Sequence, residues 1–376
     1  MSPVFVLAAG GTGGHLFPAE AVARLLVAHG GTVHLLTDRR ADAFAAAVPG
    51  VTIDRVRAGR LGGGPLRAAY GLAEMALGLV QARRLLRRLA PAAVVGFGGY
   101  MSVPTMLAAT RLGVPTLIHE QNAVFGRANR LLATRARRIA TSFAATRGLR
   151  DADRARAVHT GNPVRPAILA VGALTYPPPG KAIELLITGG SQGARIFSEI
   201  VPPALAALPA GLRSRLRVSQ PARPEDRDAV AAQYRTLGID ADVQSFFGDM
   251  PDRLARAHLV ACRAGASTVA ELAAAGRPAL LIPYPHAMDD HQTVNAAAFA
   301  EAGAGWVIPQ PAFSSATLAE RLAALLAAPQ SLTAAAAAAR AFARDDAAEH
   351  LAGMVQSLVH GGDNGAAEDP PLERAA

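Results

Sequence analysis

Val4-Phe5-Val6-Leu7-Ala8-Ala9-Gly10-Gly11-Thr12-Gly13-Gly14-His15 decides the fold, because a short apolar run passes at once into a glycine-dense turn. The arrangement returns where residues 183–188 lead into Gly189-Gly190-Ser191-Gln192-Gly193-Ala194, and where residues 92–95 lead into Gly96-Phe97-Gly98-Gly99-Tyr100. A glycine turn between a strand and a helix lets a ligand approach the backbone and offers free N–H groups to an anion. Its presence in both halves predicts sites for two phosphate-bearing molecules.

The length and composition favour two globular domains with an anionic partner. A chain of 376 residues exceeds one ordinary core. The net charge is +9, and all basic residues but Lys181 are arginine, which suits bidentate phosphate contacts. A GC-rich genome is an equally good source of this arginine bias. Nucleic acid, a phosphorylated substrate and a membrane surface all remain possible partners on charge alone. Cys262 is the single cysteine, so no intrachain disulfide forms and a reducing compartment fits.

Strand and helix patterns alternate along the chain, which predicts the α/β class. The expected strands cover residues 4–9, 32–37, 92–96, 116–119, 139–141, 183–188, 216–219, 243–247, 259–261 and 279–283; helices are expected over 18–29 and 332–342. Such alternation is typical of parallel sheets covered by helices. We therefore expect two Rossmann-like doubly wound domains that face a central cleft, with ligands at the carboxyl ends of the strands.

The domain boundaries follow from composition. We expect an N-terminal domain over 1–166, a linker over 167–182 that contains Tyr176-Pro177-Pro178-Pro179-Gly180, and a C-terminal domain over 183–340. A helix over 341–360 is expected to pack back on the N-terminal domain, and residues 361–376 to be a disordered tail. The absence of a signal pattern and of an 18-residue apolar run favours a cytosolic protein, with attachment to a membrane left open.

The first glycine turn departs from the dinucleotide fingerprint. A G-x-G-x-x-G motif that starts at Gly11 needs glycine at position 16, where Leu16 stands, and no Walker lysine follows. His15 is expected at the start of the next helix. Because a free imidazole has a pKa of about 6.5 and a positive helix end keeps it neutral, His15 is our candidate general base. A histidine that only caps or packs is the alternative.

Other polar groups follow later strands. His119-Glu120-Gln121-Asn122 suits a site floor, and Arg165, after Gly161-Asn162-Pro163-Val164, is placed to reach a phosphate or a sugar. An ordinary hinge turn is the alternative for that segment.

The densest polar group runs from Arg263 to Asn295. Arg263 and the helix start at Ser267 and Thr268 suit a diphosphate, and Glu271 suits two ribose hydroxyls, with helix capping as the alternative. The following loop suits sugar hydroxyls; its polar residues are His286, Asp289, Asp290, His291, Gln292 and Asn295. A metal site in this loop is a minority alternative, and we predict no metal and no cofactor.

Taken in order, these motifs resemble the MurG family, the bacterial N-acetylglucosaminyltransferases of peptidoglycan synthesis, over roughly residues 4–310. The resemblance implies the GT-B fold and an inverting transfer from UDP-N-acetylglucosamine to lipid I, giving lipid II. For this transfer we predict His15 as the general base and Arg263 as a group that stabilises the leaving diphosphate. The implied donor-binding residues are Thr12, Gly13, Gly14, Asn122, Arg165, Ser191, Phe247, Ala266, Ser267, Thr268, Glu271, Gln292 and Asn295. The implied acceptor-binding residues are Gly10, Gly11, Gly98, Gly99, Tyr100, Glu120 and Asn129.

The segment 71–89 joins apolar residues to an arginine cluster, which suits an anionic bilayer. With the resemblance, this predicts a peripheral protein on the inner face of the cytoplasmic membrane, with other cell-wall synthesis proteins as partners and no nucleic acid. Three alternatives stay open. They are a GT-B transferase with another acceptor, a UDP-sugar epimerase, and a non-catalytic membrane-attached protein that binds a sugar nucleotide.

Overall fold

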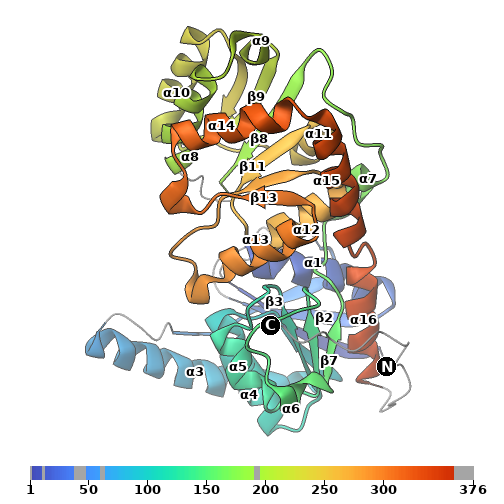
Figure 1. The fold of residues 1–376 in the computed structure, drawn as a ribbon. Helices are drawn as coiled ribbons and strands as arrows, with labels where there is room; N and C mark the ends of the chain where they lie inside the picture. The colour runs from blue at the N-terminus through green and yellow to red at the C-terminus, as the bar shows by residue number, and fades with distance from the viewer. Residues whose placement is uncertain (1, 11–12, 38–47, 60–63, 190–194, 360–376) are drawn as a thin grey trace. The chain divides into compact units, whose positions relative to one another are not determined.

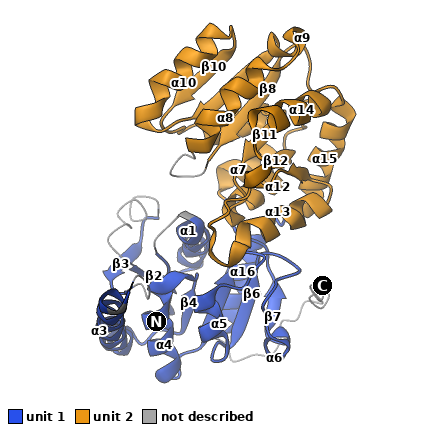
Figure 2. Cartoon of the chain, turned by 60° about the vertical axis from the view of Figure 1, so that its left-hand side comes forward, with its two compact units in different colours: residues 1–164, 344–376 blue, residues 165–343 orange. Residues whose placement is uncertain are grey.

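The chain divides into two compact units. Unit 1 comprises residues 1–164 and 344–376, and unit 2 comprises residues 165–343 (Figure 2). The computed structural model describes residues 2–10, 13–37, 48–59, 64–189 and 195–359.

Unit 1 is built on a parallel sheet in the order β3-β2-β1-β4-β5-β6-β7, seven-stranded within the described residues. Figure 1 labels strands β2, β3 and β7 of this sheet. Its strands are β1 (Val4–Ala8), β2 (Thr32–Thr37), β3 (Val51–Arg55), β4 (Ala93–Gly96), β5 (Thr116–Glu120), β6 (Arg138–Thr141) and β7 (Ala157–His159). Strands β1 to β3 follow one another toward one edge of the sheet, and the chain then returns to place β4 to β7 on the other side of β1. This reversal of the strand order is the doubly wound pattern. The carboxyl ends of β1, β4 and β5 are neighbours for this reason, and each leads into one of the polar or glycine-rich turns.

Helices cover both faces of this sheet. They are α1 (Gly13–Ala28), α3 (Pro65–Leu89), α4 (Gly99–Arg111), α5 (Arg127–Ala133), α6 (Asp151–Arg154) and α16 (Ala347–Ser357). Alternate residues of β1 serve the two faces, since Phe5 and Leu7 pack with α1 and α16 while Val6 packs with α3 and α4. Helix α16 thus returns from the end of the chain to complete unit 1 by packing on α1.

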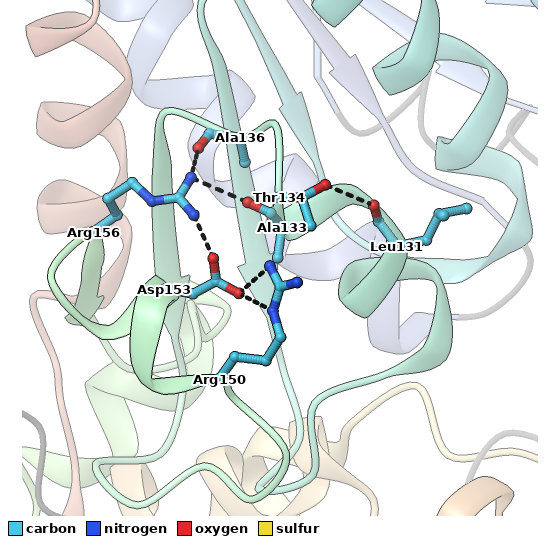
Figure 3. A network of polar contacts seen from close by, with 7 residues as sticks. All are labelled: Leu131, Ala133, Thr134, Ala136, Arg150, Asp153 and Arg156. Atoms are coloured by element: carbon cyan, nitrogen blue, oxygen red, sulfur yellow. Dashed lines mark hydrogen bonds and ion pairs between the residues drawn. The ribbon is translucent and has the colours of Figure 1, made fainter.

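A buried carboxylate fixes the far edge of this sheet (Figure 3). Asp153 accepts hydrogen bonds from Arg150, at 2.7 Å from its Nε, and from Arg156. The Arg156 guanidinium also donates to the carbonyls of Ala133, the last residue of α5, and of Ala136. The charge of Asp153 is therefore paired on both oxygens, and the turn before β7 is tied to the end of α5.

Unit 2 repeats the design with a parallel sheet in the order β10-β9-β8-β11-β12-β13, six-stranded within the described residues. Its strands are β8 (Ile183–Thr188), β9 (Leu216–Pro221), β10 (Asp240–Gln244), β11 (Leu259–Cys262), β12 (Ala279–Leu281) and β13 (Gly305–Val307). Its helices are α7 (Pro166–Gly172), α8 (Arg195–Ala206), α9 (Ala210–Arg213), α10 (Pro224–Thr236), α11 (Met250–Arg256), α12 (Ala266–Ala275), α13 (His291–Glu301), α14 (Ser315–Leu326) and α15 (Pro329–Phe342), with short 3-10 turns η1 (Met288–Asp290) and η2 (Gln310–Ala312).

Arg277 holds α11 and α12 together from inside unit 2. Its side chain is buried and donates to the carbonyls of Leu254 at 2.6 Å, Ala255 at 3.0 Å and Ala275 at 2.9 Å, at or near the ends of the two helices. A cation at helix C-termini is favourable because the carbonyl ends carry partial negative charge. This contact sets the position of α12, which carries several of the expected donor residues.

The predicted α/β class and doubly wound sheets are confirmed, but three details differ. Within the expected linker 167–182, residues up to Gly172 belong to α7, which packs against α11 and α12. Strands β3, β7 and β13 were not predicted. The strand expected at 243–247 lies instead at Asp240–Gln244, on the edge of the sheet.

In the part of the chain that the structure describes, no single helix has the length and apolar character to cross a membrane, although one bent pair, residues 315–326 with 329–357, passes that test jointly.

Candidate functional site

In unit 1, His15 lies in the first turn of α1, just after the carboxyl end of β1. Its imidazole sits against the turn that opens α4, where Gly98 and Gly99 have φ values of +83° and +71°. A Cβ atom at position 99 would lie 3.4 Å from His15 Nε2, and one at position 98 would lie 3.5 Å from His15 Cε1. Glycine is therefore favoured at both positions by the backbone conformation, while a Cβ atom at either would be in ordinary van der Waals contact with the ring.

Gly10, which follows β1, packs against the first residues of α4. A Cβ atom there would lie 2.8 Å from Cγ of Met101, in α4, so only glycine fits without a shift. Gly13 and Gly14 begin α1, and Tyr100 is half-buried at the start of α4. The structure thus gathers Gly10, Gly98 and Gly99 with His15. Gly11 and Thr12 lie outside the described residues.

Glu120 ends β5 and organises the turn that follows it. Oε1 accepts from the backbone N–H of Asn122 at 3.0 Å, and Oε2 accepts from Gly126 N–H and from Asn129 Nδ2, each at 2.8 Å. Glu120 and Asn129 are both buried. Both oxygens of Glu120 and the amide nitrogen of Asn129 thus hold the loop, and the contacts of these two side chains with an acceptor stay predictions.

His119 and Gln121 form a second polar pair beside His15. His119 is fully buried, and burial lowers the pKa of its imidazole to about 4, with the nearby His15 acting in the same direction and the hydrogen bond to Gly161 opposing it. Gln121 bridges the two histidines: Nδ1 of His15 lies 3.1 Å from Gln121 Oε1, and Nδ1 of His119 lies 3.1 Å from Gln121 Nε2. Sequence reasoning placed Gln121 in the expected site floor but gave it no role of its own, although residues 119 and 121 alternate onto one side of an extended segment.

In unit 2, the turn from β11 into α12 carries the expected diphosphate residues. Ala266, Ser267 and Thr268 form the first turn of α12, and its N-cap, Gly265, offers no side-chain hydrogen bond. Because glycine has no side chain, the first backbone N–H groups of α12 have no side-chain acceptor at their N-cap residue. Ser191, expected at the same sheet edge, lies outside the described residues.

Arg263 has a different environment from the one expected. Its side chain is buried, and Nη1 donates to the carbonyls of Ile282 at 3.0 Å and Pro283 at 3.2 Å. The guanidinium also lies 5.3 Å from the centre of the Tyr284 ring, and burial lowers its pKa. Arg263 thus supports the loop that follows β12, and its contact with a diphosphate stays a prediction.

Gln292 and Asn295, both in α13, bind the two backbone polar groups of Ala264, in the turn from β11 into α12. Gln292 Oε1 accepts from the backbone N–H groups of Ala264 at 3.2 Å and Tyr284 at 3.0 Å, while Asn295 Nδ2 donates to Ala264 O at 3.1 Å. The side chain of Asn295 is fully buried, and its contact with a sugar stays a prediction. Gln292 is only half-buried, and its oxygen is fixed inward.

Glu271, one turn into α12, pairs with Arg165, the N-cap residue of α7. Glu271 Oε1 lies 2.8 Å from Arg165 Nη2 and 2.9 Å from its Nε. Burial raises the pKa of Glu271, and the arginine opposes that shift. Arg165 was expected to reach the donor from the N-terminal domain, but it belongs to unit 2 and holds the charge of Glu271 there.

Phe247 and Asn122 complete the expected set. The Phe247 ring is 3% exposed and lies under Arg253, 3.6 Å from Cζ to the ring centre, whereas Phe246 is 76% exposed. Any contact of residue 247 with a nucleotide therefore runs through its backbone. Asn122 is half-buried and tied to Glu120. Within the described residues, no three His, Cys, Asp or Glu side chains are grouped to hold a metal ion.

Comparison with known proteins identifies relatives over the whole chain. Residues 5–141 match the glycosyltransferase family 28 N-terminal domain, and residues 184–351 match the corresponding C-terminal domain. A UDP-N-acetylglucosamine--N-acetylmuramyl-(pentapeptide) pyrophosphoryl-undecaprenol N-acetylglucosamine transferase of Rhodospirillum centenum is 55% identical over 100% of this chain and 99% of its own. The enzyme of the same name from Paramagnetospirillum magneticum is 53% identical over 95% of this chain and 97% of its own. The crystal structure of Acinetobacter baumannii MurG aligns with a TM-score of 0.76 and 33% identity, over 95% of this chain and 100% of that one.

Proposed function

This chain belongs to glycosyltransferase family 28 and to the N-acetylglucosamine transferases that its relatives represent, and from this premise we propose how its two units divide the reaction. The reaction moves N-acetylglucosamine from UDP-N-acetylglucosamine to the C4 hydroxyl of the muramoyl sugar of lipid I, which gives lipid II. The acceptor oxygen attacks the anomeric carbon, the bond to UDP breaks, and the hydroxyl proton passes to a base. The observation that carries this proposal is the 55% identity over the full chain, together with the motifs at the strand ends of both units.

Unit 2 supplies the donor site in this proposal. The N-terminus of α12 lacks a side-chain cap at Gly265, and the buried Ser267 hydroxyl has no hydrogen-bond partner among the described residues. Both features suit a diphosphate, whose oxygens accept from such donors and whose charge is favoured at a helix N-terminus. As UDP leaves, these fixed donors stabilise the charge that develops on it. Glu271 accepts from the ribose hydroxyls.

Unit 1 supplies the acceptor site and the base. His15 lies at the carboxyl end of β1 with one imidazole nitrogen held by Gln121. The N-terminus of α4, opened by Gly98 and Gly99, is a second helix start without a side-chain cap. We place the diphosphate of lipid I near this turn and assign the proton transfer to His15.

The experiment that tests the proposal measures UDP release from UDP-N-acetylglucosamine with and without a lipid I analogue. We expect release only when the analogue is present, and stoichiometric formation of the disaccharide product. Epimerised donor without acceptor would point to a UDP-sugar epimerase, and donor binding without turnover to a non-catalytic protein. Transfer of N-acetylglucosamine to an unrelated acceptor, but not to the analogue, would show that lipid I is not the acceptor substrate.

Helix α3 supports attachment to the membrane that holds a lipid-linked acceptor. Its buried side packs on the core through Ala82 and Leu86. The opposite side exposes large apolar residues, among them Leu66 at 87% and Tyr70 at 70% exposure. This apolar stripe consists of Leu66, Tyr70, Leu77 and Val80, at spacings that keep one helix face.

The same face continues into an arginine cluster. Arg83, Arg84, Arg87 and Arg88 are all exposed in the last two turns of α3. Apolar side chains that enter the acyl boundary, next to guanidinium groups that meet anionic headgroups, are what an interfacial helix requires. We therefore propose that α3 lies against the anionic inner face of the cytoplasmic membrane.

Replacement of the four arginines of this cluster by glutamine is expected to weaken binding to phosphatidylglycerol vesicles by more than tenfold, because each basic residue near such a surface contributes about 1 kcal/mol. Vesicle flotation at low and high salt measures the effect. A matched variant that removes the same charge from unit 2, at the exposed Arg223, Arg227, Arg235 and Arg321, is expected to bind nearly as wild type. Equal losses of vesicle binding in the two variants would show that net charge alone causes the attraction, and would contradict the proposed contact of α3 with the membrane.

A further inference from the structure

A line of hydrogen bonds runs through unit 1 from a backbone carbonyl to His15. His119 Nε2 lies 3.2 Å from the carbonyl oxygen of Gly161. Gln121 Nε2 lies 3.1 Å from His119 Nδ1 and 3.1 Å from the backbone oxygen of His119, and Gln121 Oε1 lies 3.1 Å from His15 Nδ1. His119 and Gln121 are buried. These hydrogen bonds thus connect His15, the base of the proposed mechanism, to the backbone carbonyl of Gly161.

The two backbone oxygens determine the direction of every bond in this line. A carbonyl oxygen only accepts, so His119 Nε2 carries the hydrogen that Gly161 receives, and the Ser142 hydroxyl, 3.1 Å from the same nitrogen, is a second acceptor. His119 Nδ1 is then the accepting nitrogen. For the same reason the Gln121 amide turns its NH₂ group toward the backbone oxygen of His119. Its oxygen therefore faces His15, and His15 Nδ1 has to donate to it.

We infer that Gln121 is a positioning residue that holds His15 in the tautomer protonated at Nδ1, so that Nε2 is the basic nitrogen. The inference rests on the proposed function only for its catalytic consequence, because the tautomer itself follows from the hydrogen bonds. Fixing one nitrogen of a histidine through a second residue is a general means of setting the role of the other nitrogen.

The surroundings of the ring agree with this assignment. His15 Nε2 points to the turn that opens α4, since a Cβ atom at Gly99 would lie 3.4 Å from it. That turn is where the proposal places the acceptor. His119 stays neutral above its lowered pKa of about 4 and so keeps an accepting Nδ1 for Gln121. The basic nitrogen and the acceptor are thus on the same side of the imidazole.

The test reads the tautomer directly by ¹⁵N NMR of histidine-labelled protein without substrates, with the His15 signals assigned from a His15→Gln spectrum. We expect the Nδ1–H form in the wild type. Gln121→Met keeps the approximate shape but cannot accept, and it is expected to shift His15 toward the Nε2–H form that water favours. Gln121→Glu retains an accepting oxygen and is expected to restore the Nδ1–H form.

Turnover provides the second readout. Gln121→Met is expected to lower kcat by about 10- to 100-fold without a change in the KM for UDP-N-acetylglucosamine, as for other residues that orient a functional histidine. Gln356→Met is the matched control, because it removes another glutamine–histidine contact of unit 1, at 3.0 Å from His29 Nδ1. This control is expected to leave the His15 tautomer and kcat unchanged.

The outcomes separate the inference from the proposed function. An Nε2–H form in the wild type overturns the inference without any variant. An Nδ1–H form that persists in a folded Gln121→Met protein also overturns it. If the tautomer behaves as expected but His15→Ala retains turnover, the hydrogen-bond assignment stands and the base of the proposed function is wrong.

Discussion

Replacement of His15 by alanine is expected to lower kcat by about 10²- to 10⁴-fold, the range that loss of a general base produces. Removal of the imidazole leaves the acceptor hydroxyl without a proton acceptor in the transition state. The donor residues of unit 2 are untouched, so the affinity for UDP is expected to stay at the wild-type value. Steady-state kinetics with a lipid I analogue, and calorimetry with UDP, measure the two quantities separately.

The pH profile makes this test specific. In the wild type, kcat falls at low pH as the base becomes protonated, and this acidic limb is expected to be absent in His15→Ala. His29→Ala is a suitable control, because His29 is an exposed histidine just beyond the C-terminal end of the same helix. Near-normal turnover in His15→Ala, or an unchanged acidic limb, would remove His15 from the base role.

The fold was largely predictable because its central strands are apolar and end in glycine turns. Strands β1, β4, β8 and β11 are buried on both faces and read as short apolar runs. The missed strands lie at or near sheet edges. Strands β7 and β13 have three residues each, and β3 is half-exposed, so none has a clear apolar pattern. Edge pairing depends on the neighbouring strand, which a local pattern does not contain.

The expected linker shows the same limit. The linker was predicted from the three prolines at 177–179, but the segment 167–182 begins within the seven-residue helix α7. Its position is set by α12, since a Cβ atom at Gly172 would lie 2.0 Å from the carbonyl oxygen of Ala274. A contact between residues so far apart in the sequence is invisible to composition.

The candidate site was predictable in place but not in detail. Polar residues at strand ends identified the segments that contain His15, Glu120 and Glu271. The direction of each side chain was not predictable, because a carboxylate that accepts from a ligand and one that accepts from its own loop are the same residue type. Glu120 belongs to the second kind, with backbone N–H donors on both oxygens. The individual role of Gln121 within the expected site floor was not predicted, since that role requires His15 from a distant element.

Glu271→Ala is expected to weaken the binding of UDP and UDP-N-acetylglucosamine by about 10- to 100-fold. A hydrogen bond to a charged group contributes about 1.5–3 kcal/mol, and each 1.4 kcal/mol is tenfold in affinity. The Glu271 carboxylate is poised for this role because Arg165, 2.9 Å from its Oε1, opposes the rise in pKa that burial causes. The variant is expected to affect kcat far less than the donor KM, since the ribose is remote from the reacting carbon.

A comparison of UDP with 2′-deoxy-UDP decides whether this carboxylate contacts the ribose. If it does, the wild type binds 2′-deoxy-UDP about tenfold more weakly than UDP, because one hydrogen bond is lost. The Glu271→Ala variant then binds the two ligands with equal affinity. Loss of Glu271 also removes the carboxylate partner of Arg165, so equal weakening toward both ligands would indicate a structural role for the pair and contradict the contact. Glu199→Ala is the matched control, because it breaks an exposed pair of the same unit, 2.8 Å from Arg195, and is expected to leave both affinities unchanged. Calorimetric titration of the two ligands into the three proteins therefore assigns Glu271 to the ribose or to the scaffold, because only a ribose contact makes its effect depend on the 2′-hydroxyl.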